Sequence, residues 1–134
     1  MWRAPTALMP PPLQHRLMAF NSADLGPHAA ALFKDMQNAA AAGLALSVIV
    51  LGAAIIDVIH HEQAGPAGYL DGAAFVYAGK KGDLGWLRGR RNHILHHEGP
   101  SDGLMGEADA EIWLAADAAR AVSTVLDFLD DLTI

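Results

Sequence analysis

The sequence predicts an all-α protein, an antiparallel bundle of four to five helices. The first observation is the segment of about Glu107 to Leu132, in which apolar residues recur every three or four positions. The second is Ala39 to Ile56, an uncharged run that suits a helix buried on most sides. The third is that no stretch alternates apolar and polar residues for long enough to predict a sheet.

The composition fits a single folded domain. The chain has 134 residues, 52% of them hydrophobic, which is enough to form a core. Residues 22–134 are assigned to the bundle. Residues 1–21 are expected to form a loosely ordered N-terminal arm, because Pro5 and Pro10 to Pro12 interrupt any helix before a short Leu13 to Phe20 segment. The absence of cysteine excludes disulfides and thiolate chemistry and agrees with a reducing cytoplasm, the location that we expect.

The apolar run Ala39 to Ile56 also meets the length criterion for a membrane span. It is rich in Ala and Gly, so its hydrophobicity is modest. It also continues directly into Asp57, His60, His61 and Glu62. A central helix of the bundle explains these features equally well, and we expect no membrane association.

Glycine and proline predict where the first two bundle helices begin and end. Ser22 or Asp24 is a candidate N-cap for a helix with Pro27 in its first turn, continuing through Ala29 to Gln37. Gly43 is expected to kink or end that helix. The following helix is expected to extend from Leu44 to Glu62 and to end at Gly65-Pro66.

Three further segments complete the expected bundle. Gly68 to Gly79 is expected to hold a short helix, and Ser101 to Gly106 a loop. Asp83 is a candidate N-cap for a helix from Leu84 to about His97. The last helix is expected to turn one apolar stripe toward the bundle, made of Ile112, Ala115, Ala116, Ala119, Val122, Leu126 and Leu129.

Basic residues are concentrated in one part of an acidic chain. The formal net charge is -6, which argues against a surface that coats nucleic acid generally. Five of the nine basic residues nevertheless fall within twelve positions, and these are Lys80, Lys81, Arg88, Arg90 and Arg91. The sequence therefore predicts a local anion site, with Lys80, Lys81, Arg88 and Arg90 as candidate substrate-binding residues.

The segment that follows these cations carries residues suited to phosphodiester cleavage. Arg91 can bind a phosphate bidentately, His96 can act as a general base or acid, and Asn92 can orient either group. RNA supplies its own nucleophile, the 2′-hydroxyl, so neither a metal nor a serine is required. The alternative interpretation is that Arg90 and Arg91 pair with acidic neighbours and that His96 is an ordinary surface residue.

The segment Arg91-Asn92-His93-Ile94-Leu95-His96 resembles the Arg-polar-x-x-x-His motif of the HEPN superfamily. These helical domains occur in many prokaryotic toxin, abortive-infection and RNA-processing ribonucleases. The similarity covers about Leu44 to Leu132. It includes an Ala/Gly-rich helix that bears a carboxylate (Asp57), the motif helix, and a long terminal helix.

The resemblance implies a function and a partner. Arg91 would be the phosphate ligand, His96 the general base or acid, and Asn92 the residue that positions them. Asp57 and His93 would be supporting residues, with Asp57 holding the arginine. It implies a metal-independent endoribonuclease without a cofactor, with the site at a homodimer cleft, RNA as substrate, and a cognate antitoxin or partner protein. Some relatives lack nuclease activity, so a non-catalytic, partner-binding module is an alternative.

A second alternative is a metal-binding bundle. His60, His61 and Glu62 form one His-His-Glu cluster, and the other, His96-His97-Glu98, is preceded by His93. His93 and His97 are four apart, a spacing that suits a pair of ligands for a divalent transition metal such as zinc, nickel or iron. The candidate ligands are His60, His61, Glu62, His93, His97 and Glu98. Histidines at helix ends are also favoured by the helix dipole alone.

Overall fold

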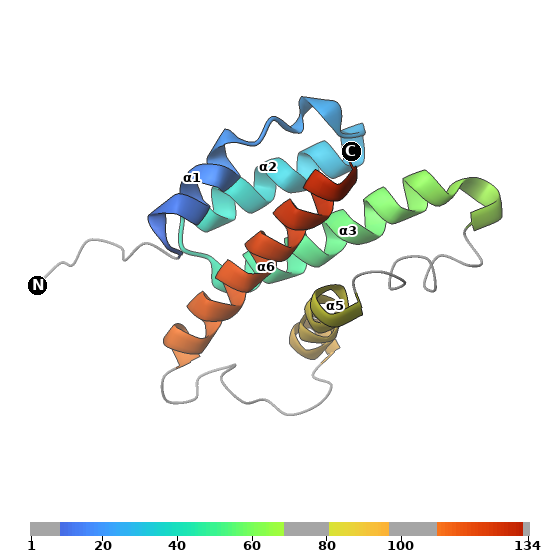
Figure 1. Cartoon of the computed structure of the whole chain (residues 1–134). Coiled ribbons are helices and arrows are strands. Elements are labelled where there is room, and N and C mark those ends of the chain that lie inside the picture. Colours follow the sequence, from blue (N-terminus) through green and yellow to red (C-terminus); the bar gives the residue numbers. More distant parts are fainter. Residues whose placement is uncertain (1–8, 69–80, 97–109, 133–134) are drawn as a thin grey trace, which may run out of the picture.

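The computed structural model describes residues 9–68, 81–96 and 110–132, and over these residues the protein is an all-α bundle without β-strands (Figure 1). The predicted class is therefore confirmed. The described elements are α1 (Pro11–Ala19), the 3-10 turn η1 (Ser22–Asp24), α2 (Pro27–Ala41), α3 (Ala45–Gly68), α5 (Lys81–His96) and α6 (Ala110–Leu132).

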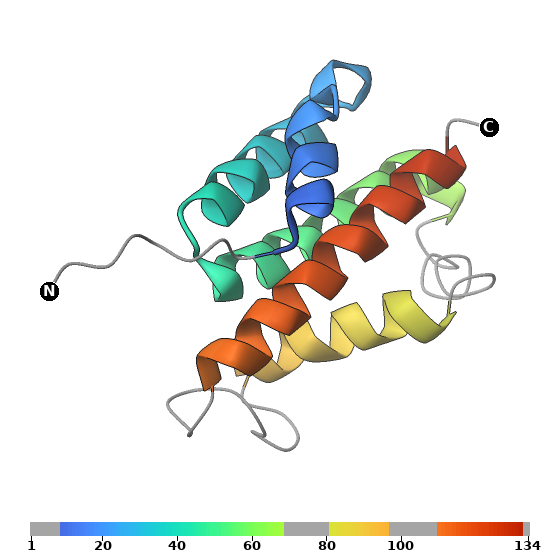
Figure 2. The same ribbon diagram turned by 60° about the vertical axis from the view of Figure 1, so that its left-hand side comes forward.

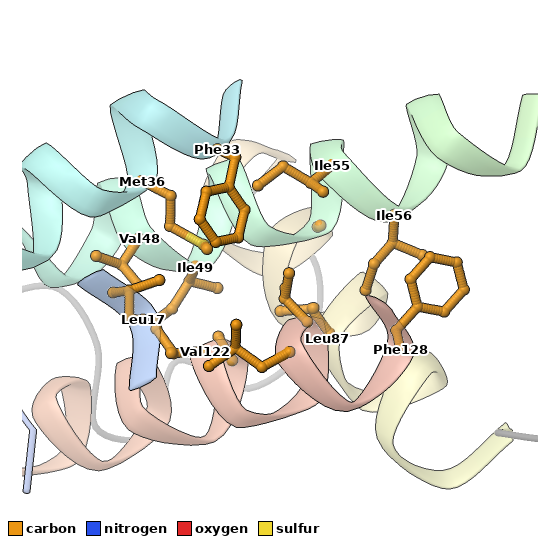
Figure 3. Packing of buried hydrophobic residues seen from close by; sticks show 14 of the residues in the cluster. Leu17, Phe33, Met36, Val48, Ile49, Ile55, Ile56, Leu87, Val122 and Phe128 are labelled. Carbon is orange, nitrogen blue, oxygen red and sulfur yellow. The ribbon is translucent and has the colours of Figure 1, made fainter. Parts of the chain in front are cut away.

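The central element of the bundle is α3, which packs against α2, α5 and α6, while α1 packs against α2 and α6 (Figure 2). The core is built where these helices meet, and its largest fully buried side chains include Leu17, Phe33, Ile49, Leu87 and Val122 (Figure 3). Every described helix thus contributes apolar surface to one core, and α5 contributes through Leu84 and Leu87.

Two helices of the bundle, α3 and α6, run in the same direction. Gly52 faces Val125, and one turn further along both helices Ile56 lies near Phe128 (Figure 3). This pair departs from the antiparallel arrangement expected from the sequence. Short turns force neighbouring helices to pack antiparallel, but α5 and its connections separate α3 from α6 in the chain, so no short turn constrains them.

One described helix is long and apolar enough to cross a membrane. It is α3, over Ala45–Glu62, with a mean hydropathy of 1.6. The buried core helix of a soluble protein meets the same criterion. In the structure α3 makes contacts with three other helices, which accounts for its apolar composition.

The N-terminal segment differs from the loosely ordered arm that the prolines suggested. From residue 9 onward it is docked: Met9 and Leu17 are buried in the core, and Arg16 donates hydrogen bonds to Asp127 and Asp130 of α6. Pro11 stands at the first position of α1, where a missing N–H costs nothing. The prolines therefore start this helix instead of preventing it. Residues 1–8 lie outside the described part of the chain.

Several helix boundaries differ from their predicted positions. Ser22 and Asp24 form η1, and Gly26 is the N-cap of α2. Gly43 has a φ of 76° and lies in the turn after α2, so the expectation that it ends the helix is confirmed. The helix α3 continues past Gly65-Pro66 to Gly68. A proline in the last turn disrupts few backbone hydrogen bonds, so it did not stop this helix.

The two later helices also differ in detail. Asp83 lies in the first turn of α5, which already begins at Lys81. The buried stripe of α6 is rotated from the predicted one, and Ile112 is 68% exposed. The buried residues of α6 are Ala118, Ala121, Val122, Thr124, Val125, Leu126, Phe128 and Leu129. Residues 69–79 and 101–106, where a short helix and a loop were expected, lie outside the described residues.

Candidate functional site

The candidate site is centred on Arg91, which the packing of α5 turns toward α3. Leu84 and Leu87 are buried, and Leu87 faces Gly52 of α3. Arg91 follows Leu87 by four positions and therefore lies on the same face of α5. Its guanidinium donates a hydrogen bond from Nη1 to Asp57 Oδ2 of α3. The expectation that Asp57 holds this arginine is confirmed.

Asn92 completes the contacts of this guanidinium. Its Oδ1 accepts hydrogen bonds from Arg91 Nε at 3.3 Å and from Nη2 at 2.9 Å. The side chain of Arg91 is 19% exposed and that of Asp57 37% exposed, so the cluster lies at the edge of the core and reaches solvent. Asp57, Arg91 and Asn92 therefore form one connected polar cluster, the Arg91 cluster.

Arg90 has its partner on α6, whereas Arg91 has its partner on α3. Arg90 Nε donates a hydrogen bond to Asp117 Oδ2 of α6 at 2.9 Å, and its Nη2 lies 2.8 Å from the same oxygen as an ion pair. The two side chains are only 21% and 15% exposed, so this pair is the more buried of the two. This pairing agrees with the alternative interpretation, in which Arg90 pairs with an acidic neighbour. The role of Arg90 in substrate binding stays a prediction. Arg88 is exposed on α5.

A third contact fixes the start of α5 on α6. The guanidinium of Arg120 lies over the ring of Trp86 at 4.1 Å and donates a hydrogen bond to Asp83 at 3.2 Å. Sequence reasoning assigned no role to Trp86 or Arg120. Charged and aromatic contacts thus supplement the small apolar face of this glycine-rich helix.

His96 does not belong to the Arg91 cluster within one chain. It is the last residue of α5 and is exposed. It follows Arg91 by five positions, so the two side chains leave a regular helix about 140° apart. The helix is continuous from Lys81 to His96, so no irregularity brings them together. No hydrogen bond joins the two residues in the described structure.

His93 is buried, with 7% of its surface exposed. Its Nε2 is shielded from solvent and has no hydrogen-bond partner among the described residues. The position of His93 on α5 accounts for this burial. His93 follows Arg90 by three positions and Trp86 by seven, which places it on the face of α5 that α6 covers.

The candidate metal ligands are dispersed in the part of the chain that the structure describes. No group of three His, Asp or Glu side chains there could hold a metal ion. His60 is buried and His61 is exposed, while the carboxylate of Glu62 lies against Gly26 at the N-terminus of α2. An acidic group at that end of a helix is favoured by the helix dipole.

The remaining candidates fall at the edges of the described structure. Lys80, His97 and Glu98 lie outside the described residues, and Lys81 is described only as the first residue of α5.

The chain matches no family model, no curated protein and no solved structure at a significant level. The residues of the described structure that can act on a phosphodiester are therefore those of the Arg91 cluster and His96.

Proposed function

We propose that this protein is a HEPN-like, metal-independent endoribonuclease. The observation that carries the proposal is the Arg91 cluster: a guanidinium at the solvent edge of the core, held by Asp57 from α3 and by Asn92 from its own helix. Because Asp57 fixes Nη1, the opposite edge of Arg91, formed by Nε and Nη2, keeps one orientation, as bidentate recognition of a phosphate requires. Arg91, Asn92 and His96 also match the HEPN motif.

In this proposal the reaction is an intramolecular transesterification of RNA. His96 removes the proton of a 2′-hydroxyl, and the 2′-oxygen attacks the adjacent phosphorus while the P–O5′ bond breaks. The proton is returned to the departing 5′-oxygen, which leaves a 2′,3′-cyclic phosphate and a 5′-hydroxyl. Arg91 stabilises the negative charge that grows on the non-bridging oxygens. No metal is needed for any step.

The site is proposed to form between two copies of the chain. Within one chain Arg91 and His96 point in directions about 140° apart, so a second chain is the simplest source of a His96 that faces Arg91. Gly85 and Gly89 have open space where a side chain would begin, and Leu95 is exposed at 54%. These features allow another helix to approach α5 closely.

The test is cleavage of single-stranded RNA by the purified chain in excess EDTA. Cleavage is expected to persist in EDTA and to be abolished in Arg91→Ala and in His96→Ala. Arg16→Ala and His28→Ala serve as matched controls, because both residues are exposed and lie on α1 and α2. Activity that survives in both site variants would refute the catalytic assignment.

Mixing the two inactive variants tests whether the site is shared. If one chain supplies Arg91 and the other His96, half of the dimers in an equal mixture are mixed, and each has one intact site of two. About a quarter of the wild-type activity should then return. If no activity returns after subunit exchange, Arg91 and His96 do not act together from two different chains.

A further inference from the structure

All three side-chain nitrogens of Arg91 donate hydrogen bonds, but their acceptors differ in strength. Nη1 donates to the carboxylate of Asp57, whereas the edge formed by Nε and Nη2 donates to a single neutral oxygen, Oδ1 of Asn92. The Nε/Nη2 edge presents two parallel N–H groups, the geometry that carboxylates and phosphates take bidentately. Asn92 therefore occupies the position where an oxyanion would bind.

The amide of Asn92 is a suitable group for temporary occupation of that edge. A hydrogen bond to a neutral oxygen is roughly half as strong as one to an ionised oxygen, so a phosphate competes well for the same donors. Asn92 is adjacent to Arg91 on α5 and half-buried, so its side chain can rotate away without any change in the helix. Asp57, on another helix, would continue to hold Nη1.

The neighbouring arginine lacks this feature. Arg90 directs both Nε and Nη2 toward the carboxylate of Asp117, and that pair is more buried than the Arg91 cluster. Displacing a buried carboxylate would leave an uncompensated charge, which is strongly unfavourable. Of these two adjacent arginines, only Arg91 has its bidentate edge covered by a neutral acceptor.

We infer that Asn92 is an exchangeable placeholder on Arg91: its amide oxygen covers the Nε/Nη2 edge in the free chain, and a phosphodiester displaces it. The inference rests on the proposed function for the identity of the ligand, an RNA phosphate, while the displacement itself requires only a phosphate oxyanion. Asn92 thereby sets the affinity of the site, and it orients Arg91 only until the phosphate binds.

The test compares Asn92→Ala with Asn92→Asp in the full chain. Alanine exposes the edge, and phosphate affinity should rise about two- to tenfold, because the one oxygen that competes for the edge is removed. Aspartate is nearly the same size but places a permanent anion on the edge, so affinity should fall by at least about tenfold. Asn38→Ala and Asn38→Asp, at an exposed position on α2, control for composition and net charge.

Binding is measured with two probes, a 2′-O-methyl RNA oligonucleotide that lacks the nucleophile and inorganic phosphate. The Nε–H resonance of Arg91, assigned with Arg91→Lys, reports directly on the edge. In the wild type it should shift on titration with either probe. In Asn92→Asp it should remain unchanged at the same concentrations. A shift with the oligonucleotide alone would also support the inference and would identify the RNA backbone as the source of the phosphate.

The outcomes separate the inference from the proposed function. Three results would overturn the inference that Asn92 is a placeholder. They are phosphate binding by Asn92→Ala that is weaker than or equal to wild type, binding by Asn92→Asp that equals wild type, and no binding of either probe by the wild type. Normal cleavage of RNA together with any of these results would leave the nuclease assignment intact. The expected binding pattern without RNA cleavage would support the placeholder and refute the nuclease. If Asn92→Ala does not fold, as judged by circular dichroism, Asn92→Asp alone decides.

Discussion

Asp57 on α3 and Arg91 on α5 form an ion pair that joins two helices across 34 positions of the sequence. This contact ties the motif helix to the central helix of the bundle. The pair is only partly buried, so solvent weakens it, and its contribution to stability is expected to be modest.

A double-mutant cycle of Asp57→Asn and Arg91→Gln measures this contribution. We expect a coupling energy of about 0.5–1 kcal/mol in the free energy of unfolding at low salt, because the pair is partly exposed. Urea denaturation monitored by circular dichroism gives the four stabilities, and molar salt should reduce the coupling. Strictly additive effects of the two changes would contradict the contact.

Asp117 and Asp127 provide a comparison between a buried and an exposed ion pair on the same helix. Asp117→Asn should lower the free energy of unfolding by about 1–3 kcal/mol, because it leaves Arg90 charged in a largely buried position. Asp127→Asn should cost less than about 1 kcal/mol, since Arg16 is more exposed and retains Asp130. Equal effects of the two changes in urea denaturation would show that burial does not set the cost.

The glycines of α5 are expected to be replaceable without loss of folding. An added Cβ at Gly85 or Gly89 meets no atom within 4 Å, so alanine should raise the free energy of unfolding by about 0.5–1 kcal/mol per site. Gly52→Ala is the contrasting change, because its Cβ would lie 3.2 Å from Val125 Cγ2 in the packed core. Thermal denaturation should give higher melting temperatures for the α5 variants and a lower one for Gly52→Ala.

The glycine variants also test the proposed dimer. If a second chain approaches α5 closely, Gly89→Ala should weaken self-association while it stabilises the isolated chain. Analytical ultracentrifugation measures the first effect. A dimer of unchanged affinity would remove α5 from the interface.

The sequence predicted the helices well where an apolar pattern determined them. The long terminal helix and the apolar central helix were both found, because each has enough apolar residues to require burial. The direction in which α3 and α6 run relative to each other was not predictable. It depends on how distant segments pack, and a periodic pattern carries no information on that packing.

The site was only partly predictable. The Asp57–Arg91 contact was expected from the resemblance and is present. The burial of His93 was not predicted, and the alternative interpretation expected an acidic neighbour for Arg90 without naming Asp117, because both depend on which face of α5 is covered by α6. Three-dimensional contacts between helices decide these details, and local spacing leaves them open.

Leu17 tests the docking of α1, the part of the fold that the sequence suggested least. Prolines at the start of a chain usually indicate an irregular segment, yet Leu17 has 0% exposure. Leu17→Ala should lower the free energy of unfolding by about 2–5 kcal/mol, because it removes buried methyl groups and leaves a cavity. The neighbouring Met18→Ala is a matched control, since Met18 is 47% exposed and should change stability by less than about 0.5 kcal/mol. If both variants have the same midpoint urea concentration of unfolding as the wild type, α1 is not part of the cooperative core in solution.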